Sequence, residues 1–325
     1  MSDHLATPGA TQGHVPVLID RVIAALAPQA GETIVDGTFG GGGYSAGLLD
    51  AADCCVLGID RDPDAVLRGA DLADRYTGRL TVVEGRFSQL DALVADHAGG
   101  GVDGVVFVLG VSSFQIDQPE RGFSFRHDGP LDMRMGSHDA SAADVVNTLS
   151  ESELTEIIGR LGEERRARTV ARAIVAARRE APIARTGELA DIVRGVVRKS
   201  PDGIDPATRT FQALRLWVND ELGELEKGLE AAEAVLHEGG RLVVVAFHSL
   251  EDRIAKRFLT ERSGNLARPS RRMPEVVDQR APTFQLIERK ALRPSDAEIA
   301  VNPRARSARL RAAIRTSAPA WRVAA

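Results

Sequence analysis

A run of four glycines, Gly40 to Gly43, separates an apolar segment from a helix-like segment. Because glycine has no side chain, such a loop lets the backbone approach a ligand closely at the end of a strand. The spacing Gly41-x-Gly43-x-x-Ala46 satisfies the loose fingerprint of a dinucleotide-binding loop, and Asp60 follows at the distance expected for an acceptor of ribose hydroxyls. These residues predict a binding site for NAD, FAD or S-adenosylmethionine.

Asp36 favours one of these three cofactors. It ends the apolar segment before the glycines, where a carboxylate would repel a pyrophosphate but attract the ammonium and sulfonium groups of S-adenosylmethionine. Each acidic residue also has a purely structural interpretation, Asp36 as a turn residue and Asp60 as part of a helix cap. Both structural interpretations would have to hold together, so we favour S-adenosylmethionine and keep a nicotinamide oxidoreductase as an alternative.

The elements that must position these residues follow an alternating pattern. Short apolar runs alternate with helix-like segments and lie at 33–35, 54–59, 80–83 and 102–111. This pattern is typical of a parallel sheet covered on both faces, so we predict an α/β fold with a doubly wound sheet. From Ser112 to about Pro206 no strand pattern appears, and it resumes at 241–247. The sequence therefore predicts a helical insertion in an α/β domain.

Four further elements are predicted beyond the insertion. An amphipathic acidic helix is expected over 217–236, and the capping-box pattern that begins at Ser249 predicts a helix through about Glu261. Late strands are expected at 283–288 and 308–314.

The charge of the chain is unevenly distributed. The 325 residues include 41 Lys and Arg against 46 Asp and Glu, a formal net charge of −5. Residues 1–159 carry 9 basic and 24 acidic side chains, and residues 160–325 carry 32 and 22. The positive charge concentrates in 160–215 and 239–325. The acidic total is therefore compatible with an RNA partner for the second half, and such binding should weaken steeply with salt.

Three features of the sequence restrict where in the cell the protein is expected. No apolar run approaches the roughly 18 residues of a membrane span, so we expect no membrane partner. The two cysteines, Cys54 and Cys55, are adjacent and can form neither a disulfide framework nor a cysteine zinc site, which favours a cytoplasmic location. Residues 1–13 have no signal-peptide pattern and are expected to be a disordered lead.

Several longer motifs resemble those of one family. They occur in order along nearly the whole chain, at residues 14–18, 36–45, 58–63, 109–113, 120–125, 128–135, 162–165, 206–213, 247–253 and 302–307. Through these motifs the sequence resembles the bacterial 16S rRNA cytosine-N4 methyltransferase family (the RsmH or MraW family). The resemblance implies a class I methyltransferase sheet, expected over 14–112 and 213–325. It also implies a helical substrate-recognition insertion, expected over 113–212.

The resemblance also implies the cofactor, the partner and the residues that bind the cofactor. The methyl donor would be S-adenosylmethionine, no metal would be needed, and the substrate would be 16S rRNA in the small ribosomal subunit. A homodimer is one oligomeric state that the sequence allows. The positions expected to contact the cofactor, with Asp36 added from the analysis above, are Gly42, Gly43, Tyr44, Asp60, Phe87 and Gln115.

One position departs from the family pattern. Val108 stands before Leu109-Gly110-Val111-Ser112-Ser113, where the family has an aspartate. A carboxylate there would accept hydrogen bonds from the target amine or the cofactor, and valine can do neither. We therefore expect an intact fold with reduced activity. A catalytically weakened relative that binds the cofactor or the ribosomal particle as an assembly factor is the alternative.

Catalytic residues are only candidates at this point. Two candidates are Ser112 and Ser113, which follow Val108 closely in the sequence. The third candidate is His248, which follows the predicted strand at 241–247. For His248 the sequence leaves open whether it lines the pocket or has a structural role. An arginine-rich stretch follows Glu163, and it could face phosphates or form a solvated helix face. Alternating arginines near the C-terminus predict a ladder on one strand face that would contact RNA, formed by Arg304, Arg306, Arg309 and Arg311.

Overall fold

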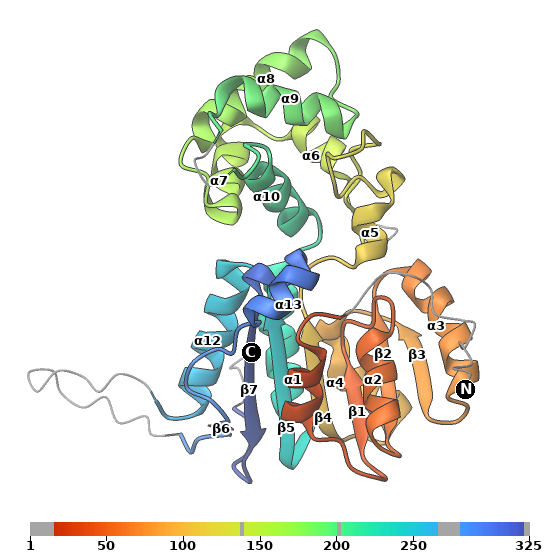
Figure 1. The fold of residues 1–325 in the computed structure, drawn as a ribbon. Helices are drawn as coiled ribbons and strands as arrows, with labels where there is room; N and C mark the ends of the chain where they lie inside the picture. The colour runs from red at the N-terminus through yellow and green to blue at the C-terminus, as the bar shows by residue number, and fades with distance from the viewer. Residues whose placement is uncertain (1–15, 137–139, 200–202, 266–279, 322–325) are drawn as a thin grey trace, which may run out of the picture.

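The computed structural model describes residues 16–136, 140–199, 203–265 and 280–321, and the lead expected at 1–13 lies outside these residues (Figure 1). A seven-stranded sheet has the order β3-β2-β1-β4-β5-β7-β6, in which β1 to β5 pair in parallel and β7 is antiparallel to its neighbours. The strands are β1 (Thr33–Asp36), β2 (Cys55–Asp60), β3 (Leu80–Glu84), β4 (Val102–Val108), β5 (Leu236–Ala246), β6 (Phe284–Leu286) and β7 (Arg309–Arg315). The predicted doubly wound α/β fold is confirmed.

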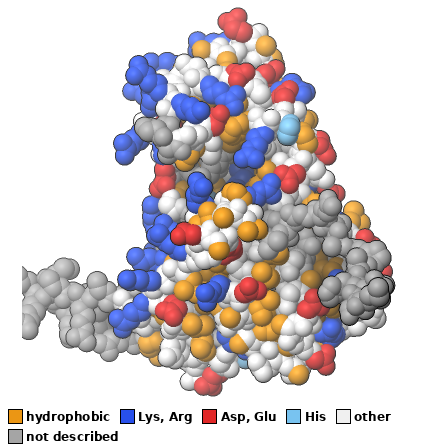
Figure 2. Space-filling model, viewed as in Figure 1, with side chains coloured by type: hydrophobic (Ala, Val, Ile, Leu, Met, Phe, Trp, Pro, Cys, Tyr) orange, Lys and Arg blue, Asp and Glu red, His pale blue; other side chains and the backbone are white. Residues whose placement is uncertain are grey.

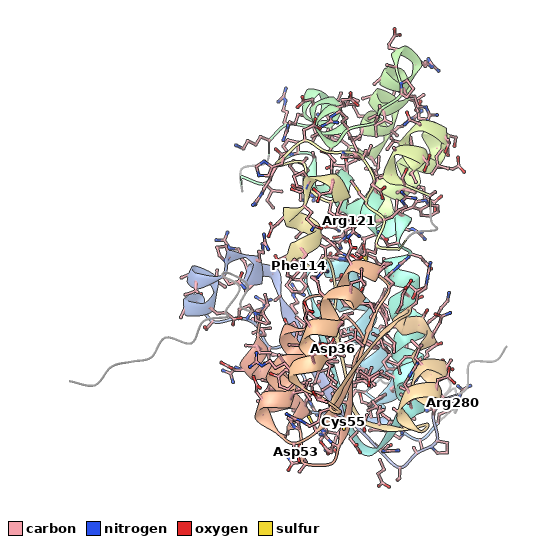
Figure 3. All side chains as sticks on the ribbon, turned by 90° about the vertical axis from the view of Figure 1, so that its right-hand side faces the viewer. Asp36, Asp53, Cys55, Phe114, Arg121 and Arg280 are labelled. Carbon is pink, nitrogen blue, oxygen red and sulfur yellow. The ribbon has the colours of Figure 1, made fainter. Side chains whose placement is uncertain are left out.

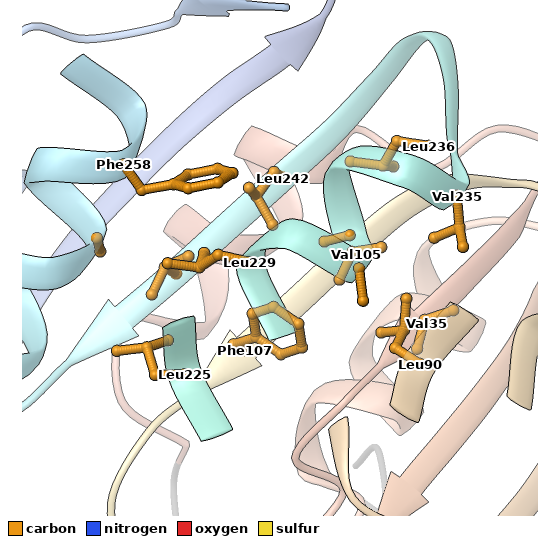
Figure 4. Close-up of a cluster of buried hydrophobic side chains, with 14 of the residues drawn as sticks. Val35, Leu90, Val105, Phe107, Leu225, Leu229, Val235, Leu236, Leu242 and Phe258 are labelled. Atoms are coloured by element: carbon orange, nitrogen blue, oxygen red, sulfur yellow. The ribbon is translucent and has the colours of Figure 1, made fainter. Parts of the chain in front are cut away.

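Helices cover both faces of the sheet. Successive strand residues point to opposite faces, and both sets are apolar, so both faces have to be buried. On one face Ile34, Val106 and Val243 are buried against α1 (Ile19–Leu26), α2 (Gly43–Ala51) and α3 (Pro63–Arg75). On the other face lie α4 (Leu90–Ala98), α11 (Glu221–Val235) and α12 (Ser249–Arg262). Val35 and Phe107 pack there against Leu90 and Leu229 (Figure 4). Nearly every residue of the central strands is thus buried, which explains their continuous apolar sequence.

A second, purely helical layer lies beyond the carboxyl ends of the parallel strands (Figure 1). Its helices are α5 (Ser113–Asp117), α6 (Ala142–Thr148), α7 (Glu151–Gly162), α8 (Ala167–Glu180), α9 (Thr186–Val196) and α10 (Thr208–Val218). It has its own core, in which Leu154, Val170, Leu189 and Phe211 are buried together. The expected boundary at 212 falls inside α10, because that helix continues to pack in this core through Leu214 and Val218.

Two predicted helix boundaries were wrong. The helix expected over 217–236 is interrupted at Asn219 and Asp220; Asp220 has a left-handed backbone (φ 46°) and caps α11. The break frees the Asn219 side chain to accept from Met135 N–H (2.9 Å) and donate to Met133 O (2.8 Å). The cap expected at Ser249 is formed one residue earlier, by His248 with Glu251.

The expected arginine ladder does not form. Arg304 and Arg306 lie in a short 3₁₀ helix, η3 (Pro303–Ser307), outside any strand. Of the four arginines expected in the ladder, Arg309 and Arg311 lie in β7, and both donate to the carboxylate of Asp252 at 2.7 Å. These two arginines therefore bind α12 to the sheet through Asp252. The late strands expected at 283–288 and 308–314 are present as β6 and β7.

Candidate functional site

Three strand ends meet at the edge of the sheet that faces the helical layer. Asp36 ends β1, Asp60 ends β2 and Val108 ends β4, and these strands are neighbours in the sheet. In Figure 3, Asp36 lies in the sheet layer, and Phe114 and Arg121 lie above it toward the helical layer. This edge is where open parallel sheets bind their cofactors.

The glycine loop curls over the end of β2. Gly40 and Gly42 both have positive φ (57° and 74°), and Gly42 precedes the first turn of α2. Phe39, which is 2% exposed, lies beneath the loop, so that a Cβ on Gly42 would come within 2.7 Å of its ring. Glycine is therefore required by the backbone angle and by the space below the loop.

Asp60 holds this loop in place. Its Oδ2 accepts from Gly40 N–H at 2.7 Å, and its Oδ1 accepts from Asp62 N–H at 2.9 Å. Burial raises the pKa of its carboxyl group, although both backbone hydrogen bonds oppose that shift. The Asp60 carboxylate therefore lies at the carboxyl end of β2, where the sequence predicts an acceptor for the ribose hydroxyls of the cofactor. That contact stays a prediction.

Asp36 lies beneath the glycine loop. It is fully buried, its Oδ2 accepts from Ser45 Oγ at 2.8 Å, and its Oδ1 accepts from Thr38 N–H at 3.3 Å. Burial raises the pKa of this carboxyl group to about 6, because two hydrogen bonds compensate only in part for lost solvation. A carboxylate this poorly compensated would be stabilised by a nearby cation, which fits the predicted ammonium or sulfonium group.

The other expected cofactor contacts lie around the same loop. Gly43 begins α2 and packs against Pro16, and the buried Tyr44 donates its hydroxyl to Val17 O at 2.7 Å. Burial raises the pKa of Tyr44 above its usual value. Phe87 follows β3 and packs against Phe107, with ring centroids 5.2 Å apart and ring planes tilted by 41°. Tyr44 therefore anchors the N-terminal segment, and cofactor contact by these residues stays a prediction.

Asp62 joins three segments around the loop. Its carboxylate is 2% exposed and accepts from Gln115 Nε2 (2.8 Å) on α5 and from Arg121 Nη2 (2.9 Å). It also accepts from Asp64 N–H (3.1 Å), which caps α3. Arg121 in addition donates to Arg134 O (3.1 Å) in the loop that leads into the helical layer. The sequence placed Gln115 in the site but gave Asp62 and Arg121 no role, because only the fold brings them together.

Each candidate catalytic side chain has a partner in the structure. Ser112 caps α5 by accepting from Gln115 N–H at 3.2 Å. Ser113 Oγ accepts from Arg304 Nη1 at 2.5 Å, and Arg304 also pairs with Asp117 at 2.7 Å. η3 therefore reaches across to the edge that carries the site.

His248 has both ring nitrogens directed at one residue. Its Nδ1 accepts from Glu251 N–H at 3.4 Å, and its Nε2 lies 3.0 Å from Glu251 Oε1. This geometry favours the structural role that the sequence left open, and the catalytic roles of Ser112, Ser113 and His248 stay predictions.

Val108 fits its strand without a polar partner for its side chain. Its N–H donates to Thr38 Oγ1 at 2.7 Å, which ties the end of β4 to the turn after β1. The half-buried valine side chain packs against the core on the α1 and α2 face. The fold accommodates the departure from the aspartate pattern, as expected for an apolar residue at a strand end.

Metal and membrane sites were also sought in the part of the chain that the structure describes. Among those residues, no group of three or more His, Cys, Asp or Glu side chains could hold a metal ion. None of the helices described is long and apolar enough to cross a membrane.

Comparison with known proteins agrees with the sequence motifs. Residues 11–316 match a family model described as the MraW methylase family. A protein of Rhodospirillum centenum named Ribosomal RNA small subunit methyltransferase H is 62% identical over 320 residues, covering 98% of this chain and 97% of that protein. A protein of the same name from Parvibaculum lavamentivorans is 60% identical, covering 94% and 91%. Among solved structures, one described as a putative rRNA-methylase from Clostridium thermocellum has a TM-score of 0.43 at 13% identity, covering 93% and 99%.

The two positive-φ glycines Gly42 and Gly78 allow a matched test of the loop. We expect Gly42→Ala to destabilise the protein by about 2–4 kcal/mol, since its Cβ would meet Leu72 and Phe39 in addition to the backbone strain. Gly78 has a similar φ of 77° with nothing within 4 Å of its Cβ, so Gly78→Ala should cost only about 1 kcal/mol. Urea unfolding of both variants measures the difference, and equal losses would contradict the packing argument.

The raised pKa of Asp36 predicts a pH-dependent contribution to stability. A carboxyl group whose pKa rises from 3.8 to about 6 on folding favours the folded state below pH 4 and loses that contribution as pH rises through 6. Relative to Asp36→Asn, the wild type should therefore lose roughly 2 kcal/mol of unfolding free energy between pH 4 and pH 7. Unfolding titrations of both proteins across that range test this, and a constant difference would refute it.

Proposed function

Because the chain belongs to the MraW methylase family, we propose that it transfers a methyl group from S-adenosylmethionine to the exocyclic N4 of a cytidine in the decoding region of 16S rRNA. The shared name of its relatives supports methyl transfer to small-subunit rRNA. The N4 position and the decoding region rest on the resemblance of the sequence motifs. The observation that carries the proposal is the glycine loop with Asp36 and Asp60 at one edge of the sheet, facing the helical layer.

The residues at this edge suit the cofactor. The loop offers close backbone approach, Asp60 places a carboxylate at the end of β2, and the buried Asp36 carries a poorly compensated charge. Gln115 and the glycine loop would hold the nucleoside and amino acid parts of S-adenosylmethionine. When bound, S-adenosylmethionine supplies a methyl group that its sulfonium already activates for transfer.

The chain then has to position the acceptor. The lone pair of cytosine N4 is delocalised into the ring, so the amine must be aligned and hydrogen-bonded before it can accept a methyl group. Alignment alone can contribute several kcal/mol. Acceptors near the end of β4 are the Leu109 carbonyl, Ser112 and Ser113, and the pair of Arg304 with Asp117 fixes the position of Ser113. Hydrogen bonding of N4 by one of these groups is the role we assign to this segment.

The helical layer is the part of the chain that we propose recognises the substrate. A target cytosine must leave its stack to reach the sheet edge, at a cost of a few kcal/mol that contacts in the pocket recover. The layer enters the chain between β4 and α11 and is tied to the cofactor side by Arg121. Since the substrate is ribosomal, we place the reaction in the cytoplasm, and a homodimer stays a prediction.

A weakly active relative that acts as an assembly factor is the second candidate function. Val108 is the specific observation that favours it, because the valine side chain cannot accept a hydrogen bond from N4 or from the cofactor. Under this alternative S-adenosylmethionine and the ribosomal particle would still bind, and methyl transfer would be slow.

The activity itself is tested with small-subunit particles from cells that lack this protein. We expect incorporation of label from methyl-labelled S-adenosylmethionine, and N4-methylcytidine on digestion of the 16S rRNA to nucleosides. Calorimetry should show binding of S-adenosylmethionine and not of NAD. Binding of NAD alone would support the oxidoreductase alternative and overturn the proposal.

Restoring the carboxylate at position 108 separates the two candidate functions. We expect Val108→Asp to raise the single-turnover rate by about 10²- to 10³-fold, if the carboxylate acts on the transition state as other preorganised polar groups do. Val108→Asn is the matched control, because it introduces polarity of similar size without the charge. Equal rates for wild type and Val108→Asp would show that valine does not limit this enzyme.

A further inference from the structure

A groove in the helical layer lies outside the site described above. It has a volume of about 710 Å³ and is formed by the start of α8, the end of α9 and the segment that leads into α10. Its lining residues are Arg166, Thr169, Arg194, Gly195, Val196, Val197, Arg198, Lys199, Asp205 and Pro206. Four of these ten side chains are cationic and one is acidic.

The charges in the groove fall into two groups. Arg194 donates to Asp205 through Nε and Nη2 and to Asp191 through Nη1, at 2.9–3.3 Å, so its charge is compensated within the protein. Arg166, Arg198 and Lys199 are exposed and form no ion pair with any residue that the structure describes. The groove therefore presents three exposed cations that form no ion pair with a described residue, beside the Arg194–Asp205 pair; of these three, Lys199 also acts on the Asp205 carboxylate and helps to lower its pKa.

The positive surface continues from the groove onto the sheet domain. Glu163, three residues before Arg166, accepts from Ser249 Oγ at 2.5 Å and from Arg253 Nη2 at 3.1 Å. This contact brings α12 next to the start of α8, and α12 adds the exposed Lys256. Figure 2 shows Lys and Arg side chains along the left edge of the molecule, over the helical layer and down onto the lower domain.

We propose that this groove binds the phosphodiester backbone of rRNA and so holds the substrate at a distance from the methylation site. Three exposed cations that line one open groove suit a chain of phosphates better than a single small anion. Arg166 and Arg198 can each contact two phosphate oxygens at once, and α8 begins at the groove, with Arg166 as its N-cap residue. The proposal rests on rRNA as the substrate.

The salt dependence of binding tests the groove directly. The variant Arg166→Gln/Arg198→Gln/Lys199→Gln removes three charges, and Arg21→Gln/Arg75→Gln/Lys227→Gln removes three exposed charges elsewhere. Binding of each full-length protein to naked 16S rRNA is measured from 50 to 200 mM salt. Each lost phosphate contact lowers the slope of log K against log salt by about 0.7–0.9. The affinity of the wild type should therefore fall about 20- to 40-fold more than that of the groove variant over this range.

The control variant should keep the wild-type slope, and all three proteins should bind S-adenosylmethionine equally by calorimetry. Equal slopes for wild type and groove variant, or equal reductions in both variants, would overturn the proposal. Loss of binding to the small-subunit particle with unchanged binding to naked rRNA would assign the surface to a ribosomal protein instead. Because binding is measured without methyl transfer, absence of wild-type activity would refute the proposed function and leave this result standing.

Discussion

The arrangement of the site depends on one buried carboxylate, that of Asp62. Its carboxylate accepts from Gln115 on α5, from Arg121 in the 3₁₀ helix that follows α5 (Pro119–Arg121), and from the first turn of its own helix. A buried acceptor with three donors fixes the geometry of all three segments, because any of them that moves away leaves a polar group unpaired. Asp62 N–H in turn donates to Asp60, and Asp60 accepts from Gly40 N–H, so the two carboxylates join the glycine loop to α5 and to the segment that carries Arg121.

Many of the arginines serve the fold and not a partner. Arg309 and Arg311 are bound by Asp252, Arg304 by Asp117 and Ser113, and Arg194 by Asp205. These arginines are therefore compensated within the protein, whereas Arg166, Arg198 and Lys199 in the groove where α8, α9 and α10 meet are exposed and form no ion pair with a described residue. The segment charges predict which half of the chain faces RNA, which stays a prediction, while the partners of individual arginines could be assigned only from the three-dimensional contacts.

The strands and the sheet edge that carries the glycine loop could be predicted because their signals are local. Apolar runs define β1 to β5, and the glycines with Asp36 and Asp60 lie at strand ends that the topology must bring together. The break at Asn219 could not be predicted, since it is stabilised by contacts with Met133 and Met135 far away in the sequence. The alternating arginines were misassigned for the same reason: a period of two does not reveal that Asp252 lies opposite.

The order of the strands also has a consequence for synthesis. β4, at the centre of the finished sheet, pairs on one side with β1 and on the other with β5, yet residues 109–235 separate β4 from β5 in the chain. While the ribosome makes these residues, the half-sheet β3-β2-β1-β4 has an open apolar edge. Such an edge can pair with other nascent chains. The helical layer has a core of residues 131–218, with Phe123 and Phe125 packed against it. It can therefore bury its own apolar surface during this interval, which keeps the exposed part of the nascent chain small.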